Sequence, residues 1–129
     1  MPYPTDRKYT KEHEWIQANG ASATVGITDY AQESLGDIVF VELPKMGAEL
    51  AVGKTFGTVE SVKAVSDLFA PASGTVTEVN GELVTSPETV NKNPHGAWMV
   101  KLTLKNPSEL EALLSAADYE KFVAEEAGH

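Results

Sequence analysis

Short β-prone segments separated by turn residues fill most of this chain and limit the folds that it can adopt. We expect strands at residues 14–18, 21–27, 37–43, 48–52, 55–61, 65–69, 74–79 and 97–104. The pair Asn19-Gly20 is a two-residue hairpin signal between the first two strands, because both residues tolerate positive φ. The run at 37–43 is dense in β-branched and aromatic residues and predicts a buried strand. Many short strands with frequent turns are typical of a β-sandwich or barrel.

Helix signals are fewer and lie mostly at the C-terminal end. Thr28 can cap a short helix that Gly36 ends, and one helical turn is expected at 87–91. Capping-box patterns at 108–111 and 115–118 predict two helices, within about 108–126, that pack on the β core. No linker or low-complexity tract divides residues 1–129, so a single domain is expected.

The segment 60–67 is nearly symmetrical in residue type, and Lys63 lies at its centre. A lysine between two short β-prone arms is expected at the tip of a hairpin, here within about 55–69. A tip lysine is displayed at a fixed place while its own stem stays flexible. Carriers of a covalently attached swinging group need that combination.

Four neighbours are expected to guide recognition of the tip by a modifying enzyme. Val62 and Ala64 offer an uncrowded and uncharged approach to Lys63, while Glu60 and Asp67 frame it with acid. The alternative is an ordinary solvated lysine, which is the common case for this residue type. That alternative does not explain the symmetry or the small apolar neighbours.

The charge balance restricts the partners. The chain carries 19 acidic and 10 basic residues, for a net charge of -9. Such a charge disfavours nucleic acid and anionic membrane surfaces and favours basic docking sites on other proteins. The sequence shows neither a signal peptide nor a transit pattern, and it has no apolar run of membrane-spanning length, so a cytoplasmic location is expected.

The residue inventory argues against catalysis by the chain itself. There is no cysteine, which excludes disulfides, thiolate catalysis and cysteine-ligated metals. His13, His95 and His129 accompany no nucleophile motif, no glycine-rich phosphate loop and no set of convergent metal ligands. We therefore expect a protein that is not an enzyme and has no metal site, in which any sulfur chemistry comes from an attached group.

The segment 56–74, with Glu-Ser-Val-Lys-Ala-Val-Ser-Asp at its centre, strongly resembles the lipoyl-attachment motif of the glycine cleavage system H-protein family. Other segments resemble the same family in the same order, at 9–15, 25–32 and 35–44, followed by matches at Val90-Asn91, Pro94 and Trp98-Met99, and the C-terminal helices resemble its tail. The resemblance covers roughly residues 7 to 125, and several long matches in order are far more specific than one short motif. One departure is a loop before Trp98 that is shorter than is usual in the family.

Two related families share the hairpin device. Biotinyl domains usually place methionine on both sides of the lysine, whereas this chain has Val62 and Ala64. Lipoyl domains of 2-oxo acid dehydrogenases are typically shorter and carry an acid just before the lysine. The C-terminal helices and the Glu-His-Glu-Trp start at 12–15 argue against such a domain, and the match along the whole chain argues against a biotinyl domain.

The resemblance implies a lipoyl-domain-like barrel-sandwich hybrid of short antiparallel strands, with lipoate amide-linked to Lys63. The arm would be on the order of 14 Å long, from about ten zigzagging single bonds. The implied partners are a pyridoxal-phosphate glycine decarboxylase, a tetrahydrofolate-dependent aminomethyltransferase, an FAD-containing dihydrolipoamide dehydrogenase, and a lipoate ligase or lipoyl transferase. The carrier, expected to be a monomer, would shuttle the aminomethyl group and electrons between these enzymes as their substrate.

The resemblance also implies a cleft that shelters the aminomethyl-loaded arm. Glu14 and Asp67 are the candidates for holding its ammonium group, and Glu12 is a weaker third candidate. The alternative is that both principal acids are solvated surface residues. A different role for the whole chain also stays open, as a carrier that donates lipoate to other proteins or serves another lipoate-dependent pathway.

Overall fold

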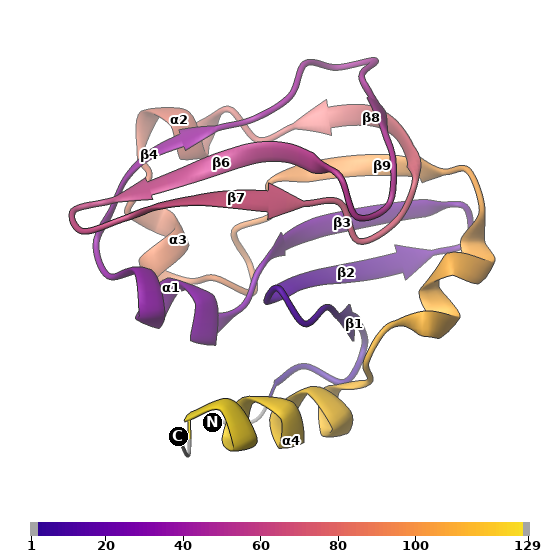
Figure 1. Ribbon diagram of the computed structural model, residues 1–129. Helices are drawn as coiled ribbons and strands as arrows, with labels where there is room; N and C mark the ends of the chain where they lie inside the picture. The colour runs from indigo at the N-terminus through magenta and orange to yellow at the C-terminus, as the bar shows by residue number, and fades with distance from the viewer. Residues whose placement is uncertain (1–2, 128–129) are drawn as a thin grey trace.

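The computed structural model describes residues 3–127, which form two antiparallel β-sheets and several short helices (Figure 1). The strands are β1 (Lys8–Tyr9), β2 (Glu14–Asn19), β3 (Ser22–Ile27), β4 (Ile38–Glu42), β5 (Glu49–Leu50), β6 (Thr55–Ser61), β7 (Val65–Phe69), β8 (Gly74–Val79) and β9 (Val100–Leu104). The helices are α1 (Asp29–Leu35), α2 (Glu82–Thr85), α3 (Thr89–Lys92), the 3-10 helix η1 (Pro107–Ala112) and α4 (Ala116–Ala127). His129 lies outside the described residues.

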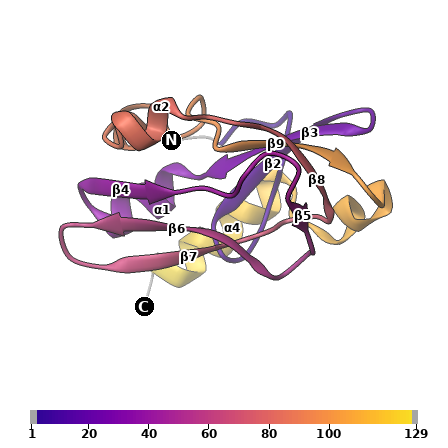
Figure 2. The ribbon, with the colours of Figure 1, turned by 90° about the horizontal axis from the view of Figure 1, so that it is seen from above.

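The two sheets lie one over the other and enclose the main core between them (Figure 2). The larger sheet has the order β1-β2-β3-β9-β8-β5, and the smaller has the order β4-β6-β7. Val41 and Val59 of the smaller sheet belong to the same buried cluster as Val25, Val76 and Leu102 of the larger. The predicted fold class, a mainly β barrel-sandwich hybrid of short antiparallel strands, is confirmed.

The first hairpin turns one residue later than predicted. Asn19 is still part of β2 and pairs with Ser22, so Gly20 and Ala21 form the turn. Gly20 has a φ of 65°, and glycine at the first of two turn positions is the pattern of a type II′ turn. The positive φ therefore falls on the glycine, and Asn19 contributes a strand pair instead.

β4 is more exposed than its apolar sequence suggests. A register shift between Ile38 and Phe40 marks a β-bulge against β6. A bulge interrupts the alternation of side chains between the two faces, and Val39 and Phe40 are consequently both exposed, at 50% and 45%. The prediction of a buried strand at 37–43 is wrong for these two residues.

α1 follows its sequence signals closely. The hydroxyl of Thr28 accepts a hydrogen bond from the backbone N–H of Ala31 at 3.2 Å, and Gly36 ends the helix with a φ of 80°. Two shorter helices follow between β8 and β9. α2 was not predicted from the sequence, and the turn expected at 87–91 is α3.

The first of the two predicted C-terminal helices is a 3-10 helix, and it begins two residues earlier than the sequence pattern indicated. Asn106 is the residue before η1, and the Ser108 hydroxyl donates to its side-chain oxygen at 2.6 Å instead of capping the helix. α4 begins at the second predicted box, where the N–H of Asp118 donates to the Ser115 hydroxyl at 3.2 Å. It lies beneath β1 in Figure 1, and its Tyr119 ring stacks on Tyr9 with ring centres 4.8 Å apart.

Candidate functional site

Lys63 lies at the exposed end of the β6–β7 hairpin, at the far left of Figure 1. The hydroxyl of Ser61 holds this turn, because it accepts the backbone N–H groups of Lys63 at 3.3 Å and Ala64 at 3.1 Å. The N–H of Ser61 also donates to the carbonyl of Ala64 at 2.7 Å. A serine that bonds the backbone a few residues ahead stabilises a turn locally. The tip backbone is therefore fixed, and the Lys63 side chain is exposed, with its Cε 3.6 Å from the position that a Cβ would take at Gly36.

A second set of contacts ties the tip to the turn between α1 and β4. The N–H of Val62 donates to the carbonyl of Asp37 at 3.0 Å. Asn91 on α3 fixes that turn, since its side-chain nitrogen donates to the carbonyl of Gly36 and its oxygen accepts the N–H of Ile38, both at 2.9 Å. The hairpin tip, the end of α1 and α3 thus form one hydrogen-bonded unit.

The four predicted recognition residues are all exposed near Lys63. Val62 and Ala64 flank it in the turn, and Val62 is 70% exposed. Glu60 lies near the end of β6, whereas Asp67 lies further from the tip on β7. Their role in recognition remains a prediction.

Glu14, at the start of β2, is a buried carboxylate with 2% of its surface exposed. One carboxylate oxygen accepts from the hydroxyl of Thr10 at 2.7 Å, and the other accepts from the backbone N–H of Phe69 on β7 at 3.2 Å. Burial raises the pKa of Glu14 to about 7, although both hydrogen bonds act to lower it. Glu14 therefore changes its charge near neutral pH, and a nearby cation would favour the ionised form.

The three acids proposed for the cleft have different surroundings. Glu14 is buried beside Phe69, whereas Asp67 and Glu12 are exposed. Phe69 follows Lys63 by six positions, or about 20 Å of extended chain at roughly 3.3 Å per residue. The lipoyl-lysine arm, on the order of 14 Å long, is shorter than that span. The joint role of these acids remains a prediction.

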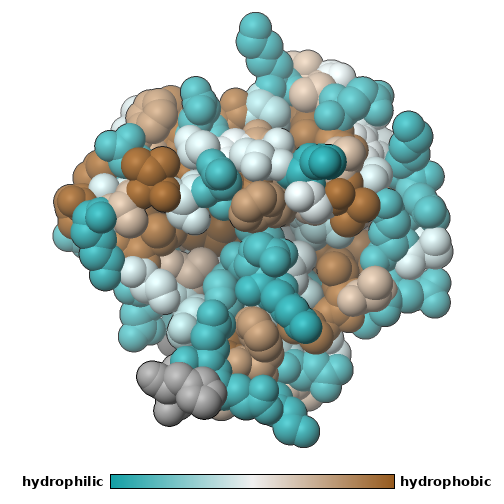
Figure 3. Space-filling model, viewed as in Figure 1, coloured by the Kyte–Doolittle hydropathy of each residue, from teal (hydrophilic) through white to brown (hydrophobic). Residues whose placement is uncertain are grey.

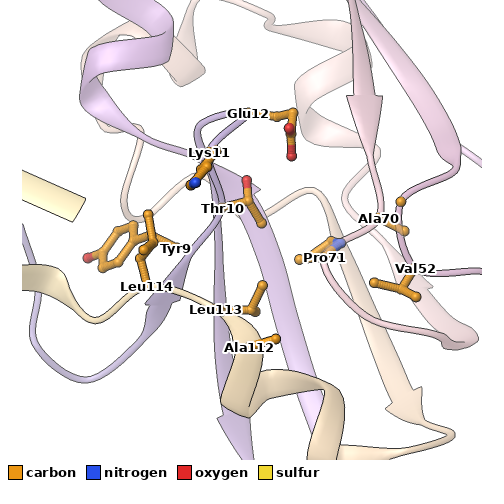
Figure 4. Close-up of a pocket in the computed structure, with 11 residues that line it drawn as sticks. Tyr9, Thr10, Lys11, Glu12, Val52, Ala70, Pro71, Ala112, Leu113 and Leu114 are labelled. Carbon is orange, nitrogen blue, oxygen red and sulfur yellow. The ribbon is translucent and has the colours of Figure 1, made fainter. Parts of the chain in front are cut away.

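A pocket of about 230 Å³ lies at the base of the hairpin, at the opposite end from Lys63. Figure 4 shows Lys11 at one side of it and Pro71 at the other, with Glu12 above and Leu113 below. Thr10 lines this pocket and also bonds Glu14. Thr10 therefore lies between the buried Glu14 carboxylate and this pocket.

His13 and His95 make structural contacts. His13 has a left-handed backbone with a φ of 74°, and its ring lies 2.7 Å from the Tyr119 hydroxyl and 3.2 Å from Glu126 of α4. Burial lowers the pKa of His13, so the neutral ring accepts from Tyr119 and donates to Glu126 at neutral pH. His95 accepts the N–H of Asp29, at the start of α1, at 3.3 Å. Both rings join elements of the fold.

Sequence reasoning did not identify three residues that shape this site, namely Thr10, Ser61 and Asn91. A serine two positions before the tip lysine is a recognisable signal for a side-chain-held turn. Asn91 gives no such signal, because its partners lie 53 to 59 positions away along the chain.

Comparisons with known proteins agree over nearly the whole chain. Residues 7–126 match the family described as "Glycine cleavage H-protein". The chain is 71% identical to the glycine cleavage system H protein of Koribacter versatilis and 60% identical to that of Acidobacterium capsulatum, over 129 residues and the full length of each. The crystal structure of a glycine cleavage system H protein from Mycobacterium marinum superposes with a TM-score of 0.85 at 43% identity, covering 98% of this chain and 100% of that one.

No helix among residues 3–127 combines the length and the apolar character needed to cross a bilayer.

Proposed function

Because the chain belongs to the glycine cleavage H-protein family, we propose that it is the lipoyl carrier of that system, with the lipoyl group joined to Lys63. The observation that carries this proposal is the display of one lysine at an exposed hairpin tip whose backbone is held from two sides. Ser61 holds the turn from within, and the carbonyl of Asp37 holds it from the α1–β4 turn.

The surroundings of Lys63 suit a covalent lipoyl group. Its amine is accessible, and no ion pair within residues 3–127 involves it. Val62 and Val65 offer exposed apolar surface beside the carbon chain of such a group. When attached, lipoate supplies the two sulfur atoms that this cysteine-free chain lacks, for aminomethyl and electron transfer.

Within this proposal, Glu14 is the partner for a cationic amine. A buried carboxylate with a pKa of about 7 loses its proton at little cost near neutral pH and then balances an adjacent positive charge. Asp67 on the exposed face of β7 is the second proposed partner. Glu12, at the side of the pocket at the hairpin base, is the weaker third.

The proposed partners are the enzymes of the glycine cleavage system, namely the decarboxylase, the aminomethyltransferase and the dihydrolipoamide dehydrogenase, together with a lipoate ligase or lipoyl transferase. Each acts on the carrier, which contributes no catalytic residue. The net charge of -9 favours docking on basic surfaces of these enzymes. We propose that the free carrier is a monomer.

Intact-protein mass spectrometry tests the attachment site. The apo chain is incubated with lipoate, ATP and a lipoate ligase, and one lipoyl adduct is expected on the wild type and none on Lys63→Arg. Lys105→Arg is the matched control, because Lys105 is also an exposed lysine. A wild type that stays unmodified, or a Lys63→Arg variant that is modified, would refute the proposal.

A second assay separates this function from donation of lipoate to other proteins. The lipoylated chain is added to purified glycine decarboxylase, and glycine–bicarbonate exchange is followed. Exchange that depends on the lipoylated chain is expected for the glycine cleavage carrier. A chain that is lipoylated but does not support exchange would favour the donor role instead.

A further inference from the structure

The surface around the tip carries several exposed apolar side chains. Val39, Phe40, Val62 and Val65 are exposed large hydrophobic residues, and we call them the tip patch. They come from the β4 bulge, the hairpin turn and the start of β7. In Figure 3, hydrophobic residues gather over the end of the β6–β7 hairpin at the left. Contiguous exposed apolar patches often mark interaction surfaces.

Strand register places part of this patch on one face of the smaller sheet. Phe40 pairs with Glu60, and Glu60 pairs with Val65, so these three side chains form a row across β4, β6 and β7. The row faces away from the core, because all three residues are exposed while Val41 and Val59 on the opposite face are buried. The bulge adds Val39 to the exposed surface.

The patch and Lys63 are held in a fixed relation. The N–H of Val62 donates to the carbonyl of Asp37, which directly precedes β4. Asn91 bonds the residues on either side of Asp37, at Gly36 and Ile38. The segment that presents Val39 and Phe40 is therefore the same segment that anchors the hairpin tip.

The length of an unmodified lysine indicates which partner needs this surface. Its side chain reaches only about 6 Å, from five zigzagging single bonds. An enzyme that acylates the bare amine must therefore bring its active site down to the tip and cover the adjacent residues. Enzymes that act at the far end of a loaded arm can remain further away.

Charge on the same face indicates the chemistry of that partner. Glu60 lies in the row between Phe40 and Val65, and Glu42 and Asp67 lie in the next row, paired through Thr58. None of these three carboxylates forms an ion pair within the part of the chain that the structure describes. A complementary surface would be apolar at its centre and carry cationic side chains around it.

We propose that the tip patch is the docking surface for the enzyme that acylates Lys63, which offers an apolar contact to Val39 and Phe40 and a cation to Glu60. This inference rests on the proposed function. In the docked complex, the Lys63 amine attacks the carbonyl carbon of a lipoyl adenylate. The amide bond forms as the mixed-anhydride bond breaks, AMP leaves and the amine loses a proton, with no change of oxidation state.

Steady-state acylation kinetics test the docking surface. The apo chain is titrated against lipoate ligase with lipoate and ATP, and the mass of the peptide containing Lys63 is followed. The double variant Val39→Ser/Phe40→Ser is expected to lower kcat/KM by at least about ten-fold, mainly through KM. Val52→Ser is the matched control, because Val52 is 46% exposed and lies before β6 at the other end of the hairpin. Its kcat/KM is expected to equal that of the wild type.

A small reagent separates docking from distortion of the tip. Labelling of Lys63 by an N-hydroxysuccinimide ester of acetate needs no docking, so its rate is expected to be equal in all three proteins. The single variant Val39→Ser, at a bulge position outside the core, serves if the double variant unfolds.

Each outcome decides between the alternatives. Equal kcat/KM for the wild type and the double variant, with Lys63 modified in both, would overturn the docking surface and leave the proposed function standing. Slower labelling by the small reagent would assign the effect to altered tip geometry and overturn the inference in the same way. A wild type that the ligase does not modify would remove the proposed function itself.

Discussion

Replacement of Glu14 by glutamine tests the account of the buried carboxylate. Glu14 is almost fully buried, and no ion pair within residues 3–127 involves it. Its hydrogen-bond partners are the Thr10 hydroxyl and the Phe69 N–H. Glutamine has nearly the same shape and can satisfy both partners, because its NH₂ can donate to the Thr10 hydroxyl and its oxygen can accept from Phe69. The substitution therefore removes the titration and little else.

The sign of the expected effect follows from the direction of the pKa shift. Burial raises the pKa of Glu14 from 4.5 to about 7, so the unfolded chain loses this proton at a lower pH than the folded chain. Between these two values the folded state binds more protons, and the free energy of unfolding falls as the pH rises. Above about pH 7 the group is ionised in both states, and its effect on the free energy of unfolding no longer changes with pH.

The magnitude follows from the same two values. A shift from 4.5 to about 7 corresponds to about 3 kcal/mol in total, at 1.36 kcal/mol per pKa unit. Between pH 5.5 and pH 8, ionisation of Glu14 therefore lowers the free energy of unfolding of the wild type by about 2 kcal/mol. The free energy of unfolding of Glu14→Gln minus that of the wild type should therefore rise by about 2 kcal/mol over this interval. Other titrating groups contribute equally to both proteins and cancel in the difference.

Urea unfolding followed by tryptophan fluorescence provides the measurement, because Trp15 is buried beside β1 and α4. Glu111→Gln is the control for loss of one carboxylate, because Glu111 is exposed and lies far from Glu14 along the chain. A Glu14→Gln difference that does not change with pH would refute the reasoning. It would mean that the two hydrogen bonds outweigh burial and that Glu14 stays ionised throughout the interval.

Two further predictions concern the hairpin tip and the contact between Gly26 on β3 and Trp15 on β2. Ser61→Ala removes the hydroxyl that holds the turn, so it should lower the free energy of unfolding by about 1 kcal/mol. It should also speed hydrogen exchange at the N–H groups of Lys63 and Ala64, and unchanged exchange at both groups would contradict the assigned role. Gly26→Ala places a methyl carbon 2.6 Å from the Trp15 ring, and urea unfolding should show a free energy of unfolding lower by about 1–3 kcal/mol. Gly81→Ala is the control, because open space surrounds Gly81. Equal stability of these two variants would contradict the packing.

Local sequence signals predicted the elements that depend only on their own residues. The strands at 55–61, 65–69 and 74–79 begin and end where predicted, because each is a short β-prone run bounded by turn residues. The cap at Thr28 and the end of α1 at Gly36 were also correct, since a cap involves only neighbours along the chain. The lysine at the hairpin tip follows from the same local pattern.

Features that depend on distant partners could not be read from the sequence. The β4 bulge arises from pairing with β6, so the exposure of Val39 and Phe40 has no signal within β4 itself. The state of Glu14 depends on the N–H of Phe69, which lies 55 positions away. Its burial and its raised pKa could therefore be seen only in the folded chain. The sequence alone left two interpretations open, a solvated surface acid or a partner for an amine.

The contacts that hold the hairpin tip leave the Lys63 amine unused. The contacts that fix it use the backbone N–H groups of Val62, Lys63 and Ala64, the Ser61 hydroxyl and the carbonyl of Asp37. Within residues 3–127, no hydrogen bond or ion pair uses the Lys63 amine. An amide formed at that amine removes one charge but breaks none of the contacts that hold the turn. In the proposed function, the enzyme that loads the carrier and the enzymes that later use it would therefore meet the same tip backbone, and the bare and loaded carrier would differ at the side chain of Lys63.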